Sequence, residues 1–337
     1  MRFLKNNIYV TAPSDSINNE GDKIRLENAI KKFNNIGIKV ILGKTVYIKN
    51  SYSDEEYQQK ALEVEGALLD DNIDTVIAAN GGNTEMNIVK YINFDKLKSE
   101  INKEKIFQGF SDNSILTFLL ATLSNWKTFY APCFPTFGYD NWDKTIMDNL
   151  ELLKGNIIDQ KSQDFFETNS FKKIKGKELC GYNLDTPSKI LELTGKENFE
   201  VRGILLGGCL DVLKQIVKSE YDKIKEYNNN HSKIIWFIEN CAMGLDELKI
   251  TLENMEKNDW FKNVCCFMIG RGKLTLNNQF LIKQNVLLLN ILSKYNVPII
   301  TNCDFGHVRP FNTLITGANV ILNYKNFKYN LKYEDIE

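Results

Sequence analysis

Residues 105–125, KIFQGFSDNSILTFLLATLSN, have the pattern of a strand, a tight turn and a helix. The segment 105–110 is short and apolar, and the segment 112–125 repeats apolar residues at three- and four-residue spacing. Ser111 stands at the turn between them. A serine at this point can cap the helix through its side-chain oxygen. It can also be a nucleophile raised on the turn. The stretch alone leaves both interpretations open.

On either side of this stretch, short apolar segments alternate with helical segments across the first half of the chain. This alternation predicts an α/β domain with an open, mostly parallel sheet covered by helices. In such sheets ligands bind at the carboxyl ends of the strands, where both NGGN (80–83) and GFSD (109–112) fall. The predicted strands are 7–10, 38–43, 73–80, 105–110 and 127–132, and the predicted helices are 22–34, 54–71, 83–92 and 112–125.

A second domain is predicted after a polar stretch, 155–175, in which the periodicity is lost. The length of 337 residues also fits two domains. We therefore expect an N-terminal domain over 1–155 that carries the nucleophile, a linker over 156–175 and a C-terminal domain over 176–337. The second domain has predicted strands at 199–206, 234–240, 264–270, 298–303 and a closing pair near 319–332, helices at 208–218, 245–258 and 277–294, and a solvated loop at 225–233.

The charge balance excludes several classes of partner. Forty-two basic and forty-three acidic side chains give a formal net charge of -1, so no general field favours nucleic acid or a membrane surface. A small molecule is the expected partner. The apolar run at 8–10 is too short for a signal peptide, and no run approaches the roughly 20 residues of a membrane span. We expect a cytoplasmic protein.

Neither a metal nor a cofactor is predicted. The seven cysteines are scattered, form no CxxC pair and are expected to be buried thiols. A zinc site normally needs closely spaced Cys or His ligands, and the chain has only two histidines. The glycine turns lack both G-x-G-x-x-G and a P-loop lysine, which argues against a nucleotide cofactor.

The two histidines make the search for a catalytic base short. His231 follows three asparagines and is expected at the surface, whereas His307 follows an apolar strand and a turn, where a side chain can face a cleft. Glu239 ends the apolar run IIWFI, and a buried carboxylate needs a hydrogen-bonded partner such as imidazole. A surface carboxylate, or an ion pair with one of the many lysines, is the alternative. Ser111, which needs a base and a group that orients that base, completes a possible triad.

Two features of the turns bear on this chemistry. Asn113 stands where the G-x-S-x-G elbow of hydrolases has its second glycine, so GFSDN is not that motif itself. The adjacent Gly81 and Gly82 permit close approach of a ligand, and their N–H groups can bind an anion or a carbonyl oxygen. An ordinary tight turn is the alternative at this position.

Six segments in order extend these observations across nearly the whole chain: NGGN (80–83), GFSDNS (109–114), TFYAPCFPTFG (128–138), RGILLGGCLDVL (202–213), IIWFIEN (234–240) and FGH (305–307). This set resembles the LD-carboxypeptidase family of serine peptidases. The stretch 109–132 is most similar to the branch that contains the microcin C immunity proteins. The resemblance implies a flavodoxin-like or amidotransferase-like N-terminal domain, a swivelling β/β/α C-terminal domain and a homodimer.

The resemblance also implies roles for single residues. The family's nucleophile falls on Ser111, its triad glutamate on Glu239 and its base on His307. The oxyanion donors would be the backbone N–H groups of Asp112 and Gly82, with Gly81 and Asn83 at the substrate. The sequence departs from the family at 207–209, where GGC replaces the usual GGN and places Cys209.

Two substrate classes follow from the resemblance: an LD-muropeptide, or a microcin C-like peptidyl or aminoacyl nucleotide. The second class needs an aromatic side chain against the adenine, for which Trp142, Tyr182 and Trp236 are candidates. The expected reaction is hydrolysis of an amide bond without a cofactor. A catalytically inactive small-molecule binder on the same fold is the alternative, and the Cys209 departure motivates it.

Overall fold

The computed structural model describes residues 4–100, 105–156 and 158–334. These residues pack into two compact units that interleave along the chain. The sequence predicted two contiguous domains with a linker over 156–175, and the two units differ from that division. Part of the predicted linker forms short strands of unit 2, and a strand near residue 314 belongs to unit 1. Unit 1 comprises Met1–Ile157, Asn169–Asn183 and Thr313–Ile315, and unit 2 comprises Ile158–Thr168, Leu184–Asn312 and Thr316–Glu337.

Unit 1 is built on a six-stranded sheet with the order β14-β5-β4-β3-β1-β2. The pairings from β2 through β5 are parallel. Its central strands are apolar and fully buried, as expected for a parallel sheet covered on both faces. The strands are β1 (Asn7–Thr11), β2 (Lys39–Leu42), β3 (Thr75–Ala78), β4 (Ile106–Gly109), β5 (Thr128–Tyr130) and β14 (Leu314–Thr316).

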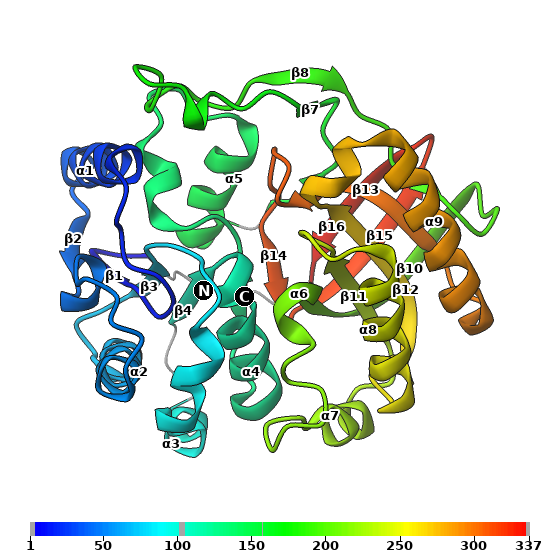
Figure 1. The fold of residues 1–337 in the computed structure, drawn as a ribbon, viewed down its shortest axis with the longest axis horizontal. Coiled ribbons are helices and arrows are strands. Elements are labelled where there is room, and N and C mark those ends of the chain that lie inside the picture. Colours follow the sequence, from blue (N-terminus) through cyan, green and yellow to red (C-terminus); the bar gives the residue numbers. More distant parts are fainter. Residues whose placement is uncertain (1–3, 101–104, 157, 335–337) are drawn as a thin grey trace. The chain divides into compact units, whose positions relative to one another are not determined.

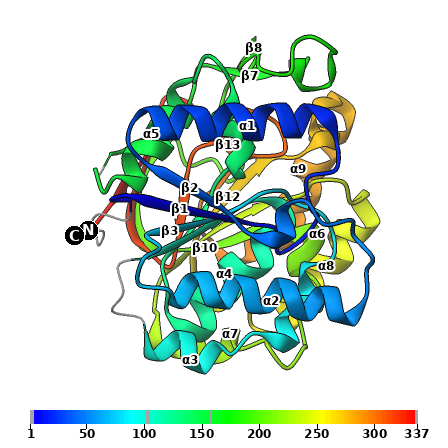
Figure 2. The same cartoon turned by 90° about the vertical axis from the view of Figure 1, so that its left-hand side faces the viewer.

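Helices cover both faces of this sheet (Figures 1 and 2): α1 and α5 lie on one face, and α2, α3 and α4 lie on the other. Side chains of Asn19, Ser53 and Asp143 cap the first turns of α1, α2 and α5. The predicted helix at 83–92 is instead a 3-10 helix, Glu85–Tyr91. The α-helices are α1 (Glu20–Asn35), α2 (Asp54–Leu69), α3 (Phe94–Ser99), α4 (Ser114–Ser124) and α5 (Lys144–Leu153).

Unit 2 is built on an eight-stranded mixed sheet with the order β6-β16-β15-β10-β11-β12-β13-β9. Its four central strands, β10 to β13, are parallel, and the flanking pairings are antiparallel. The carboxyl ends of β10 to β13 therefore lie at one edge of the sheet. The strands are β6 (Gln160–Lys161), β9 (Leu191–Glu192), β10 (Asn198–Cys209), β11 (Ile234–Glu239), β12 (Val264–Arg271), β13 (Ile299–Gly306), β15 (Asn319–Lys325) and β16 (Lys328–Tyr333).

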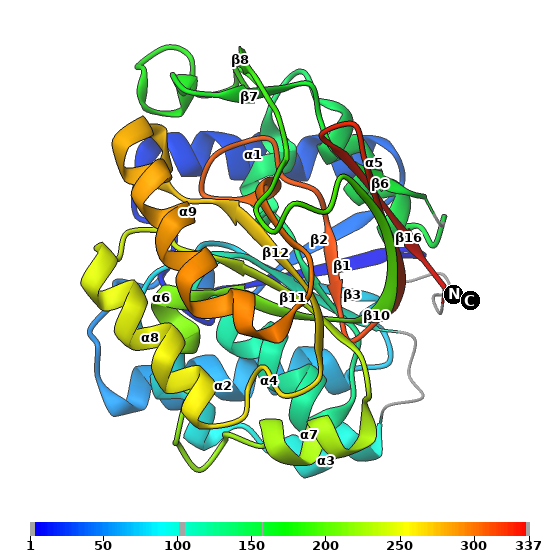
Figure 3. The same cartoon turned by 90° about the vertical axis from the view of Figure 1, so that its right-hand side faces the viewer.

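The helices α8 and α9 pack side by side on one face of the parallel strands (Figure 3). A separate antiparallel pair, β7 and β8, also belongs to this unit. The predicted α/β class with a mostly parallel N-terminal sheet is confirmed, and the sheet of the C-terminal part is mixed. The remaining elements are α6 (Leu210–Leu213), α7 (Ile224–Asn230), α8 (Leu245–Lys257), α9 (Asn278–Leu292), β7 (Phe165–Glu167) and β8 (Leu184–Pro187).

The stretch 225–233, predicted as a solvated loop, contains helix α7 instead. Ile224 and Tyr227 are buried, so packing of a few side chains overrides the polar composition of the segment. His231 follows the helix, and its ring stacks on that of Tyr227 with the centroids 4.0 Å apart. This histidine therefore has a structural role at the end of α7.

Within the described residues, no helix combines the length and the apolar character that crossing a bilayer requires. The seven cysteines are free thiols. Four of them, Cys209, Cys241, Cys266 and Cys303, are buried as predicted, whereas Cys133, Cys180 and Cys265 are partly exposed.

Candidate active site

Ser111 lies on a strained turn directly after β4. Its φ of 65° falls in the left-handed region, which residues other than glycine rarely adopt. Helix α4 begins at Ser114, and its N-cap residue is Asn113. Ser111 is therefore not the cap of this helix. A serine held in a strained conformation between a strand and a helix fits the nucleophile interpretation.

Gly109 and Asn113 shape this turn together. A Cβ atom on Gly109 would lie 2.4 Å from Cβ of Asn113, so only glycine allows the strand and the helix to approach this closely. The buried side chain of Asn113 donates through Nδ2 to the carbonyl oxygens of Phe110 and Asn80, both at 2.9 Å. The asparagine that departs from the hydrolase elbow thus ties the turn to the NGGN segment.

The Asp112 carboxylate connects the same turn to two other segments. Its Oδ2 accepts hydrogen bonds from the backbone N–H groups of Thr84 at 2.8 Å and Glu85 at 2.9 Å, and from the hydroxyl of Ser14. The side chain is completely buried. Sequence reasoning assigned a role only to the Asp112 backbone N–H and missed this carboxylate, since hydrogen bonds between distant segments leave no local pattern.

The glycine turn lies against the serine. A Cβ atom on Gly81 would lie 3.1 Å from Cβ of Ser111, which places the two turns in contact. The Gly81 N–H donates to Asn80 Oδ1 at 3.0 Å. Because that N–H is already engaged, Gly82 is the better candidate for an oxyanion donor on this turn. Gly82 and Asn83 are both exposed.

Glu85 is a second buried acid beneath the turn, and it leads to a prediction about pH. Burial, followed by the nearby Asp112 charge, raises the pKa of Glu85 well above its usual value. A raised folded-state pKa gives stability that is present below the unfolded-state pKa of 4.5 and is lost as the pH rises toward the folded-state value. Glu85→Gln should therefore gain stability relative to the wild type by up to about 1.4 kcal/mol per pH unit over that range.

Urea denaturation of both proteins between about pH 5 and 8 measures this slope. The control is Glu55→Gln on α2, because Glu55 is exposed and its pKa is lowered by hydrogen bonds from its own backbone N–H and from Ser53. The Glu55 carboxyl is ionised in both the folded and the unfolded state over this range. The difference in stability between wild type and Glu55→Gln should therefore not change with pH. Parallel curves for wild type and Glu85→Gln would show that Glu85 is not held protonated.

In unit 2, Glu239 and His307 form a buried pair. Nδ1 of His307 lies 2.9 Å from Oε2 of Glu239 and 2.8 Å from Oε1. The side chain of Glu239 is 0% exposed and that of His307 is 9% exposed. Glu239 ends β11, and His307 directly follows β13. The carboxylate at the end of the apolar run thus has the imidazole partner that its burial requires.

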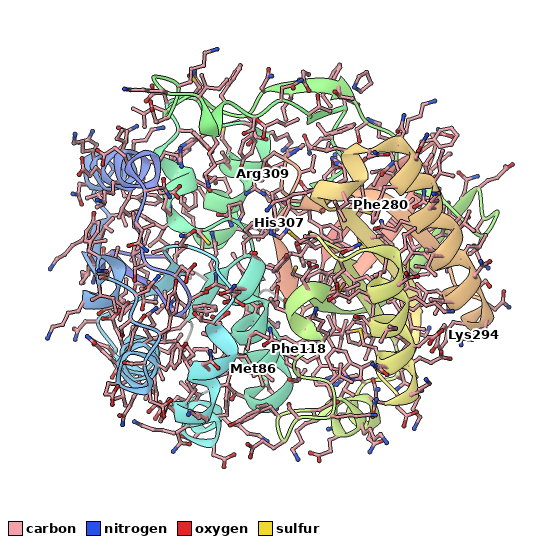
Figure 4. The ribbon with its side chains drawn as sticks, viewed as in Figure 1. Met86, Phe118, Phe280, Lys294, His307 and Arg309 are labelled. Carbon is pink, nitrogen blue, oxygen red and sulfur yellow. The ribbon has the colours of Figure 1, made fainter. Side chains whose placement is uncertain are left out.

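Gly306 makes this pair possible. Its φ of 104° is a conformation that favours glycine, and a Cβ atom there would lie 2.9 Å from Oε2 of Glu239. His307 and Arg309 lie in the segment that follows β13, and Figure 4 labels both side chains. The Arg309 guanidinium donates to the Gly306 carbonyl oxygen at 2.9 Å. This hydrogen bond holds the backbone beside the imidazole.

Cys209 stands beside this pair. It ends β10 and is the register partner of Glu239 on β11. Burial, followed by the Glu239 charge, raises the pKa of its thiol well above the usual value. Its sulfur lies 3.6 Å from Oδ2 of Asp211, whose carboxylate also accepts the N–H groups of Cys241 and Ala242. The departure GGC therefore places a neutral thiol next to the carboxylate and imidazole.

The predicted site residues fall into two groups. Ser111, Asp112, Gly81, Gly82 and Asn83 lie together in unit 1, and Glu239 and His307 lie together in unit 2. Of the three aromatic candidates for an adenine platform, Trp236 is completely buried and its ring stacks on Trp260, so it cannot receive a ligand. Trp142 and Tyr182 are both partly exposed.

Comparison with protein families agrees with this arrangement. The LD-carboxypeptidase N-terminal domain matches residues 8–131, and the LD-carboxypeptidase C-terminal domain matches residues 202–322. The chain belongs to the LD-carboxypeptidase family. The two matched ranges cover the strained serine turn and the Glu239 and His307 pair, which confirms the resemblance inferred from the sequence. No curated protein matches the chain.

Solved structures share the LD-carboxypeptidase fold along the whole chain. An MccF-like protein from Streptococcus pneumoniae in complex with AMP is 21% identical with a TM-score of 0.82, over 98% of this chain and 99% of that one. The microcin C7 self-immunity protein MccF in complex with aspartyl sulfamoyl adenosine is 18% identical with a TM-score of 0.76, over 99% and 97%. A muramoyltetrapeptide carboxypeptidase from Oxalobacter formigenes is 18% identical with a TM-score of 0.72, over 98% and 99%. These likenesses establish the fold.

Proposed function

We propose that this member of the LD-carboxypeptidase family is a serine hydrolase that cleaves an amide bond next to a small, charged carboxy-terminal group. Ser111 is the proposed nucleophile, His307 the general base and Glu239 the group that orients the base. The observation that carries the proposal is the buried contact of 2.8 Å between Glu239 and His307. Such a pair fixes the imidazole tautomer that leaves Nε2 able to accept a proton.

The proposed reaction uses only side chains and backbone groups of this chain. His307 takes the Ser111 proton through Nε2 as the hydroxyl attacks the amide carbon, and Glu239 stabilises the imidazolium that forms. The N–H groups of Gly82 and Asp112 are the proposed donors to the developing oxyanion. His307 then protonates the leaving amine, and a water molecule hydrolyses the acyl-enzyme by the same route.

Two substrate classes are proposed, and the nucleotide class is the first to test. Similar structures are described with AMP or aspartyl sulfamoyl adenosine bound, which favours a peptidyl or aminoacyl nucleotide. The similarity to the muramoyltetrapeptide carboxypeptidase from Oxalobacter formigenes supports the second class, for which we propose a muropeptide that ends in a D-amino acid. Trp142 and Tyr182 are the aromatic side chains that we propose for contact with an adenine. The homodimer and the cytoplasmic location stay predictions.

Product analysis tests the activity and the substrate class together. The purified chain is incubated with aminoacyl sulfamoyl adenosines and with LD-tetrapeptides, and mass spectrometry detects the released amino acid or truncated peptide. Release from one class identifies the substrate. Thermal stabilisation by a compound that is never cleaved would instead support the inactive binder. The proposal would be contradicted if no compound were cleaved and none stabilised the protein.

A further inference from the structure

Three different metal-ligating side chains converge at the carboxyl edge of the unit 2 sheet. Ligand atoms of Cys209, Glu239 and His307 all lie within 4.8 Å of one another. Each residue stands at or directly after the end of a parallel strand, β10, β11 or β13. The residues are far apart in the sequence, which explains why the spacing of cysteines and histidines gave no sign of a metal site.

We propose that Cys209, Glu239 and His307 bind a zinc ion that reversibly blocks the hydrolase. Thiolate, imidazole and carboxylate are the three ligand types that Zn²⁺ prefers. Ligand atoms of a tetrahedral zinc lie about 3.3–3.6 Å apart, given bond lengths of roughly 2.0–2.3 Å. Because Nδ1 of His307 is only 2.8–2.9 Å from the Glu239 oxygens, the wide separations, of up to 4.8 Å, are those to the Cys209 sulfur. Zinc binding therefore requires the sulfur to approach by about 1.2 Å and the imidazole–carboxylate separation to widen by about 0.5 Å. Solvent or an exogenous ligand takes the fourth position.

The charges of the three side chains suit a divalent cation. One thiolate and one carboxylate neutralise Zn²⁺ completely, and a neutral cluster avoids the cost of burying an unpaired charge. The Asp211 carboxylate, 3.6 Å from the Cys209 sulfur, adds a negative charge nearby. The thiolate also selects for zinc against magnesium and calcium, which prefer ligand sets made of oxygen atoms.

Binding exchanges protons in a defined way. The Cys209 thiol releases its proton to solvent as the sulfur bonds to zinc. Zinc takes the place of the proton on Nδ1 of His307, and that proton moves to Nε2, so the ring stays neutral and one proton leaves per ion. Because Nε2 then carries a proton, it cannot accept the Ser111 proton. The blocking effect rests on the proposed function, whereas metal binding itself does not.

Cobalt provides a direct readout, since Co²⁺ occupies zinc sites and its bond to a thiolate absorbs in the near ultraviolet. The chelator-treated full chain is titrated with Co²⁺ and then with Zn²⁺. We expect a thiolate-to-cobalt band that saturates at one ion per chain and is abolished by zinc. Cys209→Ser should lose the band and bind cobalt at least about 10-fold more weakly. Wild-type protein without the band would overturn the proposal.

The matched control is Cys265→Ala. Cys265 is at the amino end of β12, at the edge of the sheet opposite the proposed site, and its partly exposed thiol lies 3.4 Å from the Ile234 carbonyl oxygen. Cys265→Ala should keep the thiolate-to-cobalt band. If Cys265→Ala lost the band and Cys209→Ser kept it, the proposed site would be contradicted. Turnover is then measured with and without zinc, and the rate of each protein is compared with its own zinc-free rate. This measurement separates the proposed hydrolase from the proposed metal site. Cobalt binding through Cys209 without turnover keeps the metal site and removes the hydrolase. Turnover that zinc inhibits equally in Cys209→Ser keeps the hydrolase and removes the metal site.

Discussion

Ser111→Ala is expected to lower kcat by a factor on the order of 10⁶, because the reaction loses the atom that forms the acyl-enzyme. The remaining binding groups and N–H donors then give only a slow background rate. Single-turnover kinetics on the preferred substrate, with product detected by mass spectrometry, measures the loss. Binding of an uncleaved substrate analogue should change little, since the hydroxyl acts mainly in the transition state.

Two further variants separate the chemistry of Ser111 from its strained backbone. Ser111→Gly removes the same hydroxyl but relieves the left-handed conformation at φ 65°, so it should be equally inactive and about 1 kcal/mol more stable than Ser111→Ala. Ser53→Ala removes the N-cap of α2 and should cost about 1 kcal/mol of stability without affecting kcat. Retention of a large fraction of the rate in Ser111→Ala would sink the nucleophile assignment.

Features that depend on one strand or one turn could be predicted from the sequence. The apolar run that ends in Glu239 favoured a buried carboxylate with a partner over a surface carboxylate, and in the structure Glu239 is buried beside His307. The strand, turn and helix pattern of 105–125 indicated a tight turn at Ser111, and the missing Cβ of Gly109, two residues earlier, proves necessary against Asn113. In both cases the local pattern and the tertiary contact impose the same constraint, so the prediction holds.

Features that depend on several distant segments could not be predicted. Asp112 accepts hydrogen bonds from Ser14 and from the turn at Thr84, and no spacing in the sequence relates these residues. Cys209 was recognised only as a departure from a pattern, because its position beside Glu239 follows from strand register. Helix α7 forms because Tyr227 is buried against the rest of unit 2, which a polar local sequence does not reveal.

Glu239→Gln is expected to lower kcat by roughly 10⁴-fold while KM changes little, by analogy with the acid of other serine triads. Glutamine has the same size, and its side-chain oxygen can still accept a hydrogen bond from Nδ1 of His307. The substitution therefore removes the negative charge and, if the amide nitrogen faces the ring, also reverses the tautomer. Steady-state kinetics on the preferred substrate separates kcat from KM, and denaturant unfolding checks that the fold is retained.

The control for this experiment is Glu253→Gln on α8, which removes a carboxylate from a largely exposed pair with Lys249 at 3.9 Å. Exposed pairs contribute little, so kcat and stability should stay close to the wild type. If Glu239→Gln behaved like this control, the buried pair would only hold the sheet edge together, and His307 would need another group to orient it. A large loss confined to kcat would show that Glu239 acts on His307 during the reaction, by holding its tautomer and by stabilising the positive charge that the imidazole acquires, and its complete burial beside the imidazole suits both roles.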